Sequence, residues 1–294
     1  MSQGLTVGAS VSSALPVVDV RFFEQNGYFI AKNAFSSEEI QTMRERLSAV
    51  RERSLQVKGF DRDPKNPHLI LILGDVLSKP ELRELQYLLF DDRVLSCAKQ
   101  ILGPHLVYFG DSSVQSGEGL RGFHKDNVDR TDGSAPDWQS PYTLVRFGLY
   151  LQDHSRYSGG LKLKPGSQNY ANKFRGKAIN LFIQAGDLAM WNMRITHSGN
   201  FVRLRVAPKA CLHPRIERLI PYWMRVREQL ERFAVFGTFA APGIHLERYL
   251  SFVGSRPDYK PHFQRSAFNE ELEGWLKRRG VQLLRAVPEH GSLI

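Results

Sequence analysis

Short β-rich runs separated by glycine and proline turns recur along the chain from residue 105 onward. This pattern restricts the possible folds more than any other feature of the sequence. The runs cover residues 105–109, 142–151, 179–183, 188–191 and 233–239. Many short strands joined by such turns are typical of a β-sandwich or barrel. Helices do not alternate with these strands, which argues against a parallel Rossmann-type sheet, and no internal repeat is visible.

The first hundred residues have a different pattern. Residues 28–30 are β-rich, and Ser36 with Glu39 forms a capping box that predicts the start of a helix. Apolar residues then recur at helical spacing, which gives that helix one apolar face. A second helix is predicted over residues 80–102, after a loop over 59–69. We therefore expect a mainly β core with flanking helices.

The 294 residues fit one decorated domain, because β-barrels often run long as single domains. We interpret residues 1–17 as a flexible N-terminal tail and residues 18–294 as the domain. Apolar residues at helical spacing predict a helical insertion at about 214–231. A helical C-terminal extension is expected from about 245.

Charge and composition narrow the class of protein. The net charge of +10 favours anionic partners, but the basic residues are dispersed and match no nucleic-acid-binding module. There is no apolar run of 18 residues, so no membrane span is expected. Two cysteines give neither a disulfide framework nor a zinc motif, and we predict a cytoplasmic protein with reduced thiols. The sequence does not indicate an oligomeric state.

The first motif that carries chemistry is Phe123-His124-Lys125-Asp126. Alternate residues of a strand face the same side, so His124 and Asp126 would point together and Lys125 away. An imidazole and a carboxylate on one face can occupy adjacent positions on a metal ion. Taken alone, the motif is a weak signal, and a surface His–Asp pair is the more common explanation of it.

A third ligand is available at His197, which follows the run 188–191 and precedes a glycine turn. A histidine in such a place is more often structural. Combined with His124 and Asp126 in a β-rich core, however, it completes two histidines and one carboxylate with open positions, the set that non-haem Fe(II) oxygenases use.

The order of four segments makes the prediction more specific: FHKD at 123–126, GGLKLKPGS at 159–167, GDLAMWN at 186–192 and HSGN at 197–200. With the opening stretch FFEQNGYFIAKNAF, this order resembles the phytanoyl-CoA dioxygenase-like (PhyH) family over roughly residues 18–240. The resemblance implies a double-stranded β-helix (jelly-roll, cupin-like) core, Fe(II), and 2-oxoglutarate and O2 as cosubstrates.

The resemblance also implies an arginine that grips the distal carboxylate of 2-oxoglutarate, since a guanidinium can make two parallel bonds to a carboxylate. The family places it about eleven positions after the distal histidine, where this chain has Pro208. Three arginines remain as candidates. Arg232 is favoured because it stands directly before a predicted strand, ahead of Arg205 and Arg203.

Other polar residues are candidates for the mouth of the site. Asp111, Ser113 and Gln115 lie on a strand-like run before the motif, and Asn127 follows it. Arg146 lies within the run 142–151, where an inward arginine would be costly without an anion, so an outward position is the simpler interpretation. Two further histidines, His154 and His245, are interpreted as structural, the first in a loop.

The function that these observations favour is an Fe(II)- and 2-oxoglutarate-dependent dioxygenase that hydroxylates a small molecule, with an anionic one as a candidate, and releases succinate and CO2. Related halogenases lack the carboxylate, so Asp126 predicts hydroxylation or another oxidative outcome rather than halogenation. Two alternatives stay open. One is an oxygenase acting on a macromolecule, and the other is a non-catalytic jelly-roll binding protein.

Overall fold

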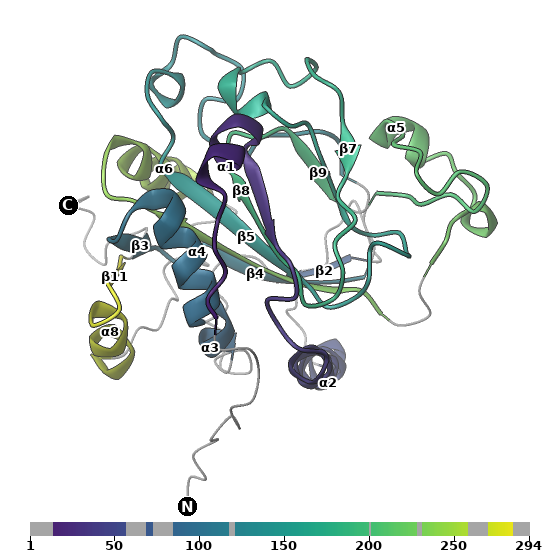
Figure 1. The fold of residues 1–294 in the computed structure, drawn as a ribbon, viewed down its shortest axis with the longest axis horizontal. Helices are drawn as coiled ribbons and strands as arrows, with labels where there is room; N and C mark the ends of the chain where they lie inside the picture. Colours follow the sequence, from purple (N-terminus) through teal and green to yellow (C-terminus); the bar gives the residue numbers. More distant parts are fainter. Residues whose placement is uncertain are drawn as a thin grey trace, which may run out of the picture.

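The computed structural model describes residues 14–56, 69–72, 85–117, 121–199, 201–227, 231–257 and 270–284. Two β-sheets form its centre, and helices cover the larger sheet (Figure 1). This arrangement confirms the expected mainly β core with flanking helices. The expected loop over 59–69 lies outside the described residues except at Leu69, which begins a strand.

The larger sheet has eight strands. Its main path runs β1 (Tyr28–Ala31), β8 (Leu188–Asn192), β5 (Leu144–Tyr150), β10 (Phe233–Ala240), β3 (Leu106–Tyr108) and β11 (Val281–Leu283). In addition, β4 (Ser112–Gly117) pairs with β10 and with β2 (Leu69–Ile72). All neighbours are antiparallel except β11, which runs parallel to β3. The left-handed backbone at Gly110 (φ 85°) separates β3 from β4, so both strands can pair with β10.

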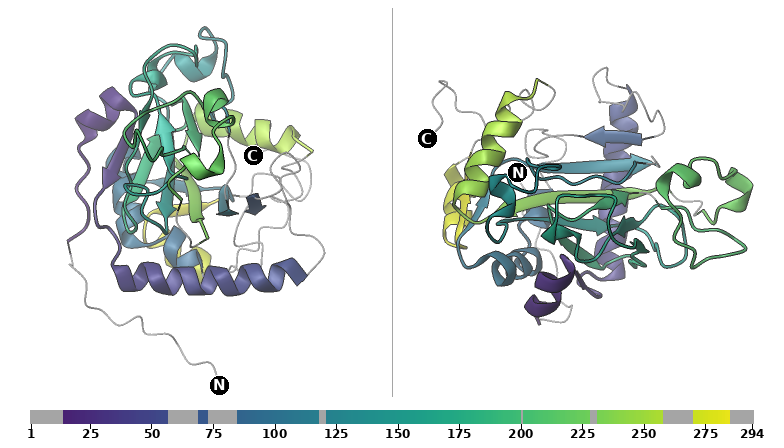
Figure 2. Two further views of the ribbon diagram at one scale, coloured as in Figure 1. Left: turned by 90° about the vertical axis from the view of Figure 1, so that its right-hand side faces the viewer. Right: turned by 90° about the horizontal axis from the view of Figure 1, so that it is seen from above.

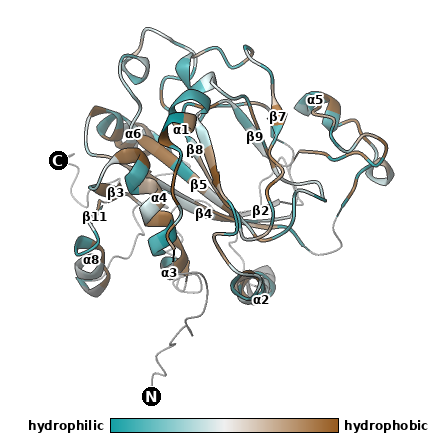
Figure 3. Ribbon diagram, viewed as in Figure 1, coloured by the Kyte–Doolittle hydropathy of each residue, from teal (hydrophilic) through white to brown (hydrophobic). Residues whose placement is uncertain are grey.

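The smaller sheet has the order β7 (Ile179–Asn180), β6 (Leu161–Leu163) and β9 (His197–Gly199). An apolar core fills the space between the two sheets, with side chains from both of them. Its buried members are Tyr150, Leu161, Leu163, Leu181, Ile183, Ala189, Trp191, Ile195 and Ala234. Strands coloured as hydrophobic converge here in Figure 3.

Helices pack on the other face of the larger sheet. They comprise α1 (Val20–Asn26), α2 (Ser37–Gln56), α3 (Gln86–Leu89) and α4 (Asp92–Leu102), with α8 (Glu270–Lys277) nearer the β3 and β11 edge. Helix α6 (Ile244–Ser255) lies instead on the face that carries Arg146, because its Tyr249 hydroxyl donates to Asp111, which also accepts from Arg146. Figure 2 shows α2 lying along one side of the molecule, with its axis across the strands. Outward side chains of the central strands, such as Phe147 and Phe239, join buried residues of α4 in one core.

The capping box at the start of α2 is confirmed. Glu39 accepts a hydrogen bond from the backbone N–H of Ser36 (2.7 Å), and the Ser36 hydroxyl accepts one from the N–H of Glu39 (3.2 Å). The single helix expected over 80–102 is wrong for its described part, which forms α3 and α4 with a break at Phe90 and Asp91. The break arises because the Asp91 side chain accepts the Arg93 N–H and caps a new helix.

The insertion differs from the expected helix over 214–231. It contains only α5 (Pro214–Glu217) and a 3-10 turn, Tyr222–Met224, in a mainly irregular segment, while residues 228–230 lie outside the described part. Pro221 stands between the two turns and lacks the N–H that a continuous helix would need. Apolar spacing alone does not register such a break.

Near the ends of the described chain, α6 begins at Ile244, close to the expected start of a helical extension at about 245. Strand β11 was not expected there. Residues 1–13 of the expected flexible tail lie outside the described part, whereas Pro16 accepts a hydrogen bond from Gln100 of α4 and Val18 donates one to it. The chain is therefore attached to the domain from about residue 16.

Candidate metal centre

Backbone hydrogen bonds bring His124 and His197 together from segments 73 positions apart. The N–H of His124 donates to the carbonyl of His197 (3.0 Å), and the N–H of His197 donates back (2.9 Å). Asp126 is fixed next to them because its N–H donates to the carbonyl of Met193 (2.9 Å). The strand expected for the HxD motif is thus a single bridge to β9 rather than a ladder, but the two side chains do meet.

The three side chains form one compact cluster. One potential ligand atom from each of His124, Asp126 and His197 lies within 4.8 Å of the others. The Nε2 atoms of His124 and His197 are 3.6 and 3.5 Å from the two carboxylate oxygens of Asp126, and the imidazole centroids are 4.3 Å apart. His197 is buried, while His124 remains partly exposed on the open side.

The donor set fits a metal ion. The Nδ1 atom of His124 lies 2.8 Å from the carbonyl of Gly122, and that of His197 lies 3.2 Å from the carbonyl of Ile195. A carbonyl can only accept, so each Nδ1 carries the proton and each Nε2 presents its lone pair toward Asp126. Metal-binding histidines are oriented in this way by a hydrogen bond at the other ring nitrogen.

Electrostatics keep the three ligands in the forms that bind a cation. Burial alone would raise the pKa of Asp126, but Arg146 and the two histidines hold it well below its usual range. Burial lowers the pKa of His197 to about 3, against the opposing effect of Asp126. The cluster is therefore one carboxylate with neutral imidazoles near neutral pH, as metal coordination requires.

Arg146 points inward, so the outward interpretation was wrong. From β5 it donates to Asp126 Oδ2 (3.0 Å), Asp111 Oδ2 (2.6 Å) and Thr238 Oγ1 (3.0 Å). The anion that stabilises an inward arginine is the pair of carboxylates Asp126 and Asp111. Asp111 also accepts from Tyr249 of α6 (3.3 Å). This network holds the Asp126 carboxylate in a fixed orientation.

Lys125 points away from the cluster, as expected, but into the protein rather than into solvent. Its side chain is 1% exposed, and Nζ donates to the carbonyls of Ser167 and Arg194, both at 2.6 Å. Burial lowers the pKa of Lys125 to about 7. It ties the HxD segment to the segments before and after β7 and β8, a role that no sequence signal marked.

The three candidate arginines are placed differently. Arg232 is buried just before β10, donates from Nε to the carbonyl of Gly159 (2.8 Å) and lies over the Tyr150 ring. Arg205 is exposed and donates to the carbonyl of Trp223 in the insertion. Arg203 is half-buried and lies over the ring of Phe182.

A line of rings separates Arg232 from His197. Tyr150, Phe236 and Trp191 follow one another at centroid distances of 5.8 and 6.1 Å, and Trp191 lies 6.0 Å from His197. Arg232 and Phe236 are four residues apart, so they share the inward face of β10. Arg232 thus lies at the Tyr150 end of this line of rings and His197 at the Trp191 end.

Other expected residues have structural places. Asn127 is buried and donates to Asp137, so it does not line the mouth. His154 lies in the loop between β5 and β6, as expected, and is fully buried there, and His245 lies within 3.3 Å of the hydroxyls of Ser140 and Thr143. Ser113 and Gln115 are half-buried at alternate positions of β4. Cys97 and Cys211 are free thiols.

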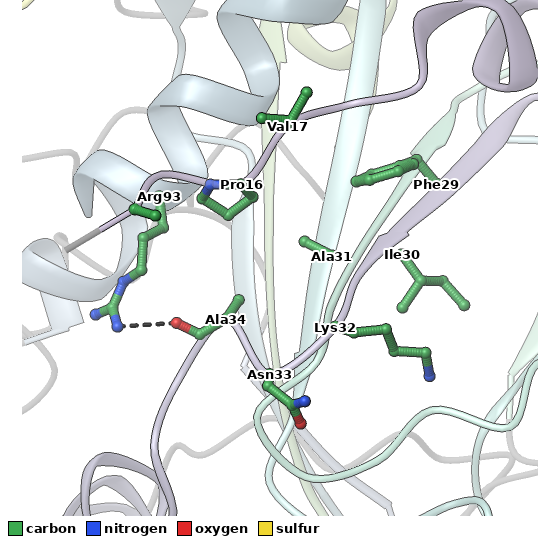
Figure 4. A pocket seen from close by; sticks show the side chains of 10 residues that line it. Pro16, Val17, Phe29, Ile30, Ala31, Lys32, Asn33, Ala34 and Arg93 are labelled. Carbon is green, nitrogen blue, oxygen red and sulfur yellow. Dashed lines mark hydrogen bonds between the residues drawn. The ribbon is translucent and has the colours of Figure 1, made fainter. Parts of the chain in front are cut away.

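A separate groove lies beside β1, away from the cluster. Pro16 and Val17 border it on one side, residues 29–34 on the other, and Arg93 donates to the carbonyl of Ala34 at its end (Figure 4). None of the three cluster residues lines it. We assign no function to this groove.

The sequence profile of the family described as "Phytanoyl-CoA dioxygenase (PhyH)" matches residues 23–201, more than half of the chain. The matched range contains the whole His124, Asp126 and His197 cluster. This chain belongs to the phytanoyl-CoA dioxygenase family. No curated protein sequence matches it.

Solved structures with the same fold are distant in sequence. EctD from S. alaskensis with 2-oxoglutarate and 5-hydroxyectoine is 14% identical, with a TM-score of 0.55 and 80% of each chain covered. HygX from Streptomyces hygroscopicus with nickel, 2-oxoglutarate and hygromycin B is 15% identical, with a TM-score of 0.53, covering 75% of this chain and 85% of that one. The carbocyclase SnoK from nogalamycin biosynthesis is 16% identical, with a TM-score of 0.52, covering 78% and 89%. EvdMO1, at 17% identity and a TM-score of 0.51, is a longer chain of which 49% is covered.

These comparisons confirm three predictions. The family resemblance is correct, and the core is the jelly roll of 2-oxoglutarate oxygenases. Family membership together with the His–Asp–His cluster confirms iron, 2-oxoglutarate and O2 as cofactor and cosubstrates of an oxygenase. Among the described residues, no helix is both long and apolar enough to cross a membrane.

Proposed function

We propose that this oxygenase hydroxylates a small molecule at a metal ion held by His124, Asp126 and His197. The observation that carries the proposal is the compact cluster of two Nε2 atoms and one carboxylate, in which backbone carbonyls orient both imidazoles. Three ligands on one side leave open positions for a chelating cosubstrate and for oxygen. The balanced reaction converts 2-oxoglutarate, O2 and a C–H bond into succinate, CO2 and a hydroxylated product.

When bound, iron supplies the oxygen chemistry. The residues of this chain position and orient the substrate and exclude water. Arg146 fixes the Asp126 carboxylate through its hydrogen bond and charge. The buried ring of Trp191 lies beside His197, and the half-buried Phe236 packs on Trp191, so the two rings exclude water from the inner side of the cluster. Such a dry, preorganised site makes each polar contact to the bound groups stronger than it would be in water.

We propose that Arg232 anchors the distal carboxylate of 2-oxoglutarate. Its inward direction and burial support this role, and Arg146 already faces two carboxylates. Arg205 is the weaker candidate, because it is exposed on the insertion and donates to Trp223. Arg203 ranks below it, since it lies over an outer phenylalanine ring.

The substrate is proposed to be small and anionic or heavily oxygenated. The insertion and the segment from about 245 flank the cluster: His213 lies 5.4 Å from the ring of Phe123, and Tyr249 reaches Asp111. Basic residues are frequent in the insertion, which favours anions. We propose that residues 18–294 act as one domain in the cytoplasm.

We propose hydroxylation as the outcome, and Asp126 at the third ligand position argues against halogenation. One of the similar structures, SnoK, is a carbocyclase, so the fold itself does not decide the outcome. An oxygenase for a macromolecule remains the second candidate, favoured only by the net charge of +10. A non-catalytic binding protein is the least supported, since the oriented cluster would then have no use.

The deciding experiment is anaerobic addition of Fe(II) and 2-oxoglutarate to metal-free protein, followed by visible absorbance. We expect a weak charge-transfer band that needs both additions. His197→Ala, His124→Ala and Asp126→Ala should each lose the band and the turnover while keeping the circular dichroism of the fold. Retention of the band in all three variants would overturn the metal assignment.

The anchor is tested by titrating 2-oxoglutarate into the Fe(II) protein and following the same band. Arg232→Ala should lower the affinity for 2-oxoglutarate at least about tenfold, because a buried bidentate pair contributes more than about 1.4 kcal/mol. Arg205→Ala is the matched control and should change the affinity less than about twofold. The reverse pattern would assign the anchor to Arg205.

A further inference from the structure

The insertion between β9 and β10 extends away from the two sheets (Figures 1 and 2). Large apolar side chains cover its outer surface. Their exposed fractions are 83% for Val206, 51% for Ile216, 81% for Leu219, 57% for Tyr222 and 74% for Trp223. Brown and teal segments alternate along it in Figure 3. Single exposed apolar residues are ordinary, but five in one segment of 18 residues indicate an interaction surface.

Buried polar contacts hold this segment in shape. Arg225 is 8% exposed and donates from Nε and Nη2 to the carbonyl of Ile220 (2.9 and 2.6 Å). Glu217 forms a fully buried ion pair with Lys162 of β6 at 2.6 Å. These contacts fix the conformation of the insertion. The apolar side chains therefore stay exposed, although burying them would be favourable.

The same segment is strongly basic. Residues 203–227 contain seven arginines and lysines, and Glu217, their one acidic residue, is used in the buried pair with Lys162. Five of the basic side chains are exposed, namely Arg205, Lys209, Arg215, Arg218 and Arg227. The outer surface of the insertion thus combines bulky apolar groups with positive charge.

A second loop repeats this combination beside the first. Phe174 is 74% exposed between Lys173 and Arg175, and Lys177 follows. Lys164 donates to the carbonyls of Lys173 (3.0 Å) and Phe174 (2.9 Å) and lies 4.9 Å from the ring of Phe123.

The two loops share an edge of the smaller sheet. Asn180 of β7 donates to the carbonyl of Ala210 in the insertion (3.0 Å). Burial raises the pKa of Cys211, and the nearby positive charge of Lys177 opposes that rise. His213 of the insertion also contacts Phe123, next to the metal ligand His124. We call residues 170–177 and 203–227 together the basic–apolar rim, because His213 contacts Phe123 directly and the other loop is joined to Phe123 through Lys164.

We propose that the basic–apolar rim docks this enzyme on the surface of an anionic lipid bilayer. Convex loops with exposed Trp, Leu and Phe side chains can enter the interfacial region, where aromatic and aliphatic groups are favoured. Arginines and lysines around them are attracted by anionic headgroups, at about fivefold in affinity for each charge near the surface. The open side of the cluster would then lie close to the membrane.

The test is sedimentation of the full chain with vesicles of phosphatidylcholine alone or of equal parts phosphatidylcholine and phosphatidylglycerol. We expect binding only to the anionic vesicles, with loss at high salt. Trp223 should shift its fluorescence to shorter wavelength on binding. The assay needs no iron and no turnover, so its result is independent of the proposed reaction.

Two double variants separate the two contributions. Lys209→Glu with Arg215→Glu should weaken binding more than about tenfold, and Leu219→Ser with Trp223→Ser should weaken it to a similar extent. The matched charge control is Lys277→Glu with Arg278→Glu at α8, and the matched apolar control is Ile244→Ser, a residue that is 55% exposed. Both controls should bind nearly as well as the unchanged chain.

Three outcomes would overturn the proposal. One is absence of binding to anionic vesicles. Another is equal weakening by the control reversal at α8, which would show a general effect of net charge. The third is tight binding to poly-glutamate without binding to vesicles, which would assign the rim to an acidic protein partner.

Discussion

The buried ion pair between Lys162 and Glu217 allows a quantitative prediction. Both side chains are 0% exposed and their charged atoms are 2.6 Å apart. Glu217 also accepts the N–H of Val202 (2.9 Å), while Lys162 donates to the carbonyl of Leu212. The pair therefore joins the insertion to β6, which is the neighbour of the strand carrying His197.

Replacing Glu217 by Gln keeps the shape but leaves the ammonium of Lys162 buried without a counter-charge. Removing one partner of a buried pair costs about 3–5 kcal/mol. That is a large part of the about 5–15 kcal/mol that separates a typical folded domain from its unfolded state. We expect this decrease in the free energy of unfolding, measured by urea denaturation at pH 7.

The double variant Lys162→Met with Glu217→Leu removes both charges and should recover most of that loss, because buried pairs are often replaceable by apolar residues. Together with the single variants Lys162→Met and Glu217→Leu, the double variant forms a cycle that isolates the coupling energy. A cost below about 1 kcal/mol for Glu217→Gln would refute the reasoning. So would an unchanged urea midpoint accompanied only by proteolysis within residues 203–227, because the pair would then hold the loop alone.

Two further predictions concern stability. Burial lowers the pKa of His154 from 6.5 to about 3, so the unfolded chain binds a proton that the folded one does not. The contribution of His154 to the free energy of unfolding should therefore be greatest above pH 6.5 and fall by up to about 1.4 kcal/mol per pH unit below it. His154→Gln should reduce that slope by about one proton in urea titrations at pH 7, 6 and 5, and an unchanged slope would contradict the assignment. Gly186 has φ 92°, and a Cβ there would lie 2.4 Å from the carbonyl oxygen of Phe35. Gly186→Ala should lower the thermal midpoint clearly, at a cost of at least about 2 kcal/mol, whereas Gly199→Ala, where a Cβ meets nothing within 4 Å, should change it little.

Most of the core was predictable because its signals are local. Alternating apolar runs and turn residues gave β3, β5, β8 and β10 within one or two residues of their ends. The capping box gave the start of α2 because two side chains and two N–H groups within four residues decide it. The grouping of His124, Asp126 and His197 came from residue types and motif order, which do not depend on exact strand limits.

The missed features depend on contacts that are distant in sequence. The inward direction of Arg146 is set by Asp111 and Asp126, which lie 35 and 20 positions away. Lys125 can be buried because carbonyls 42 and 69 positions away accept hydrogen bonds from its ammonium group. Strand β11 is only three residues long and depends on pairing with β3, so its own sequence gives little indication of it.

The pairing of the larger sheet has a consequence for how the chain folds during synthesis. Tyr28 of β1 pairs with Trp191 of β8, and Leu106 of β3 pairs with Val281 of β11. In each pair, the second strand is therefore synthesised more than about 160 residues after the first. Contacts at such separations slow folding and leave apolar strand edges unpaired for longer. At a typical rate of about 5–20 residues per second, β1 stays without its partner for roughly 8–30 seconds on the ribosome. Production of this protein should accordingly benefit from chaperones that cover open strand edges.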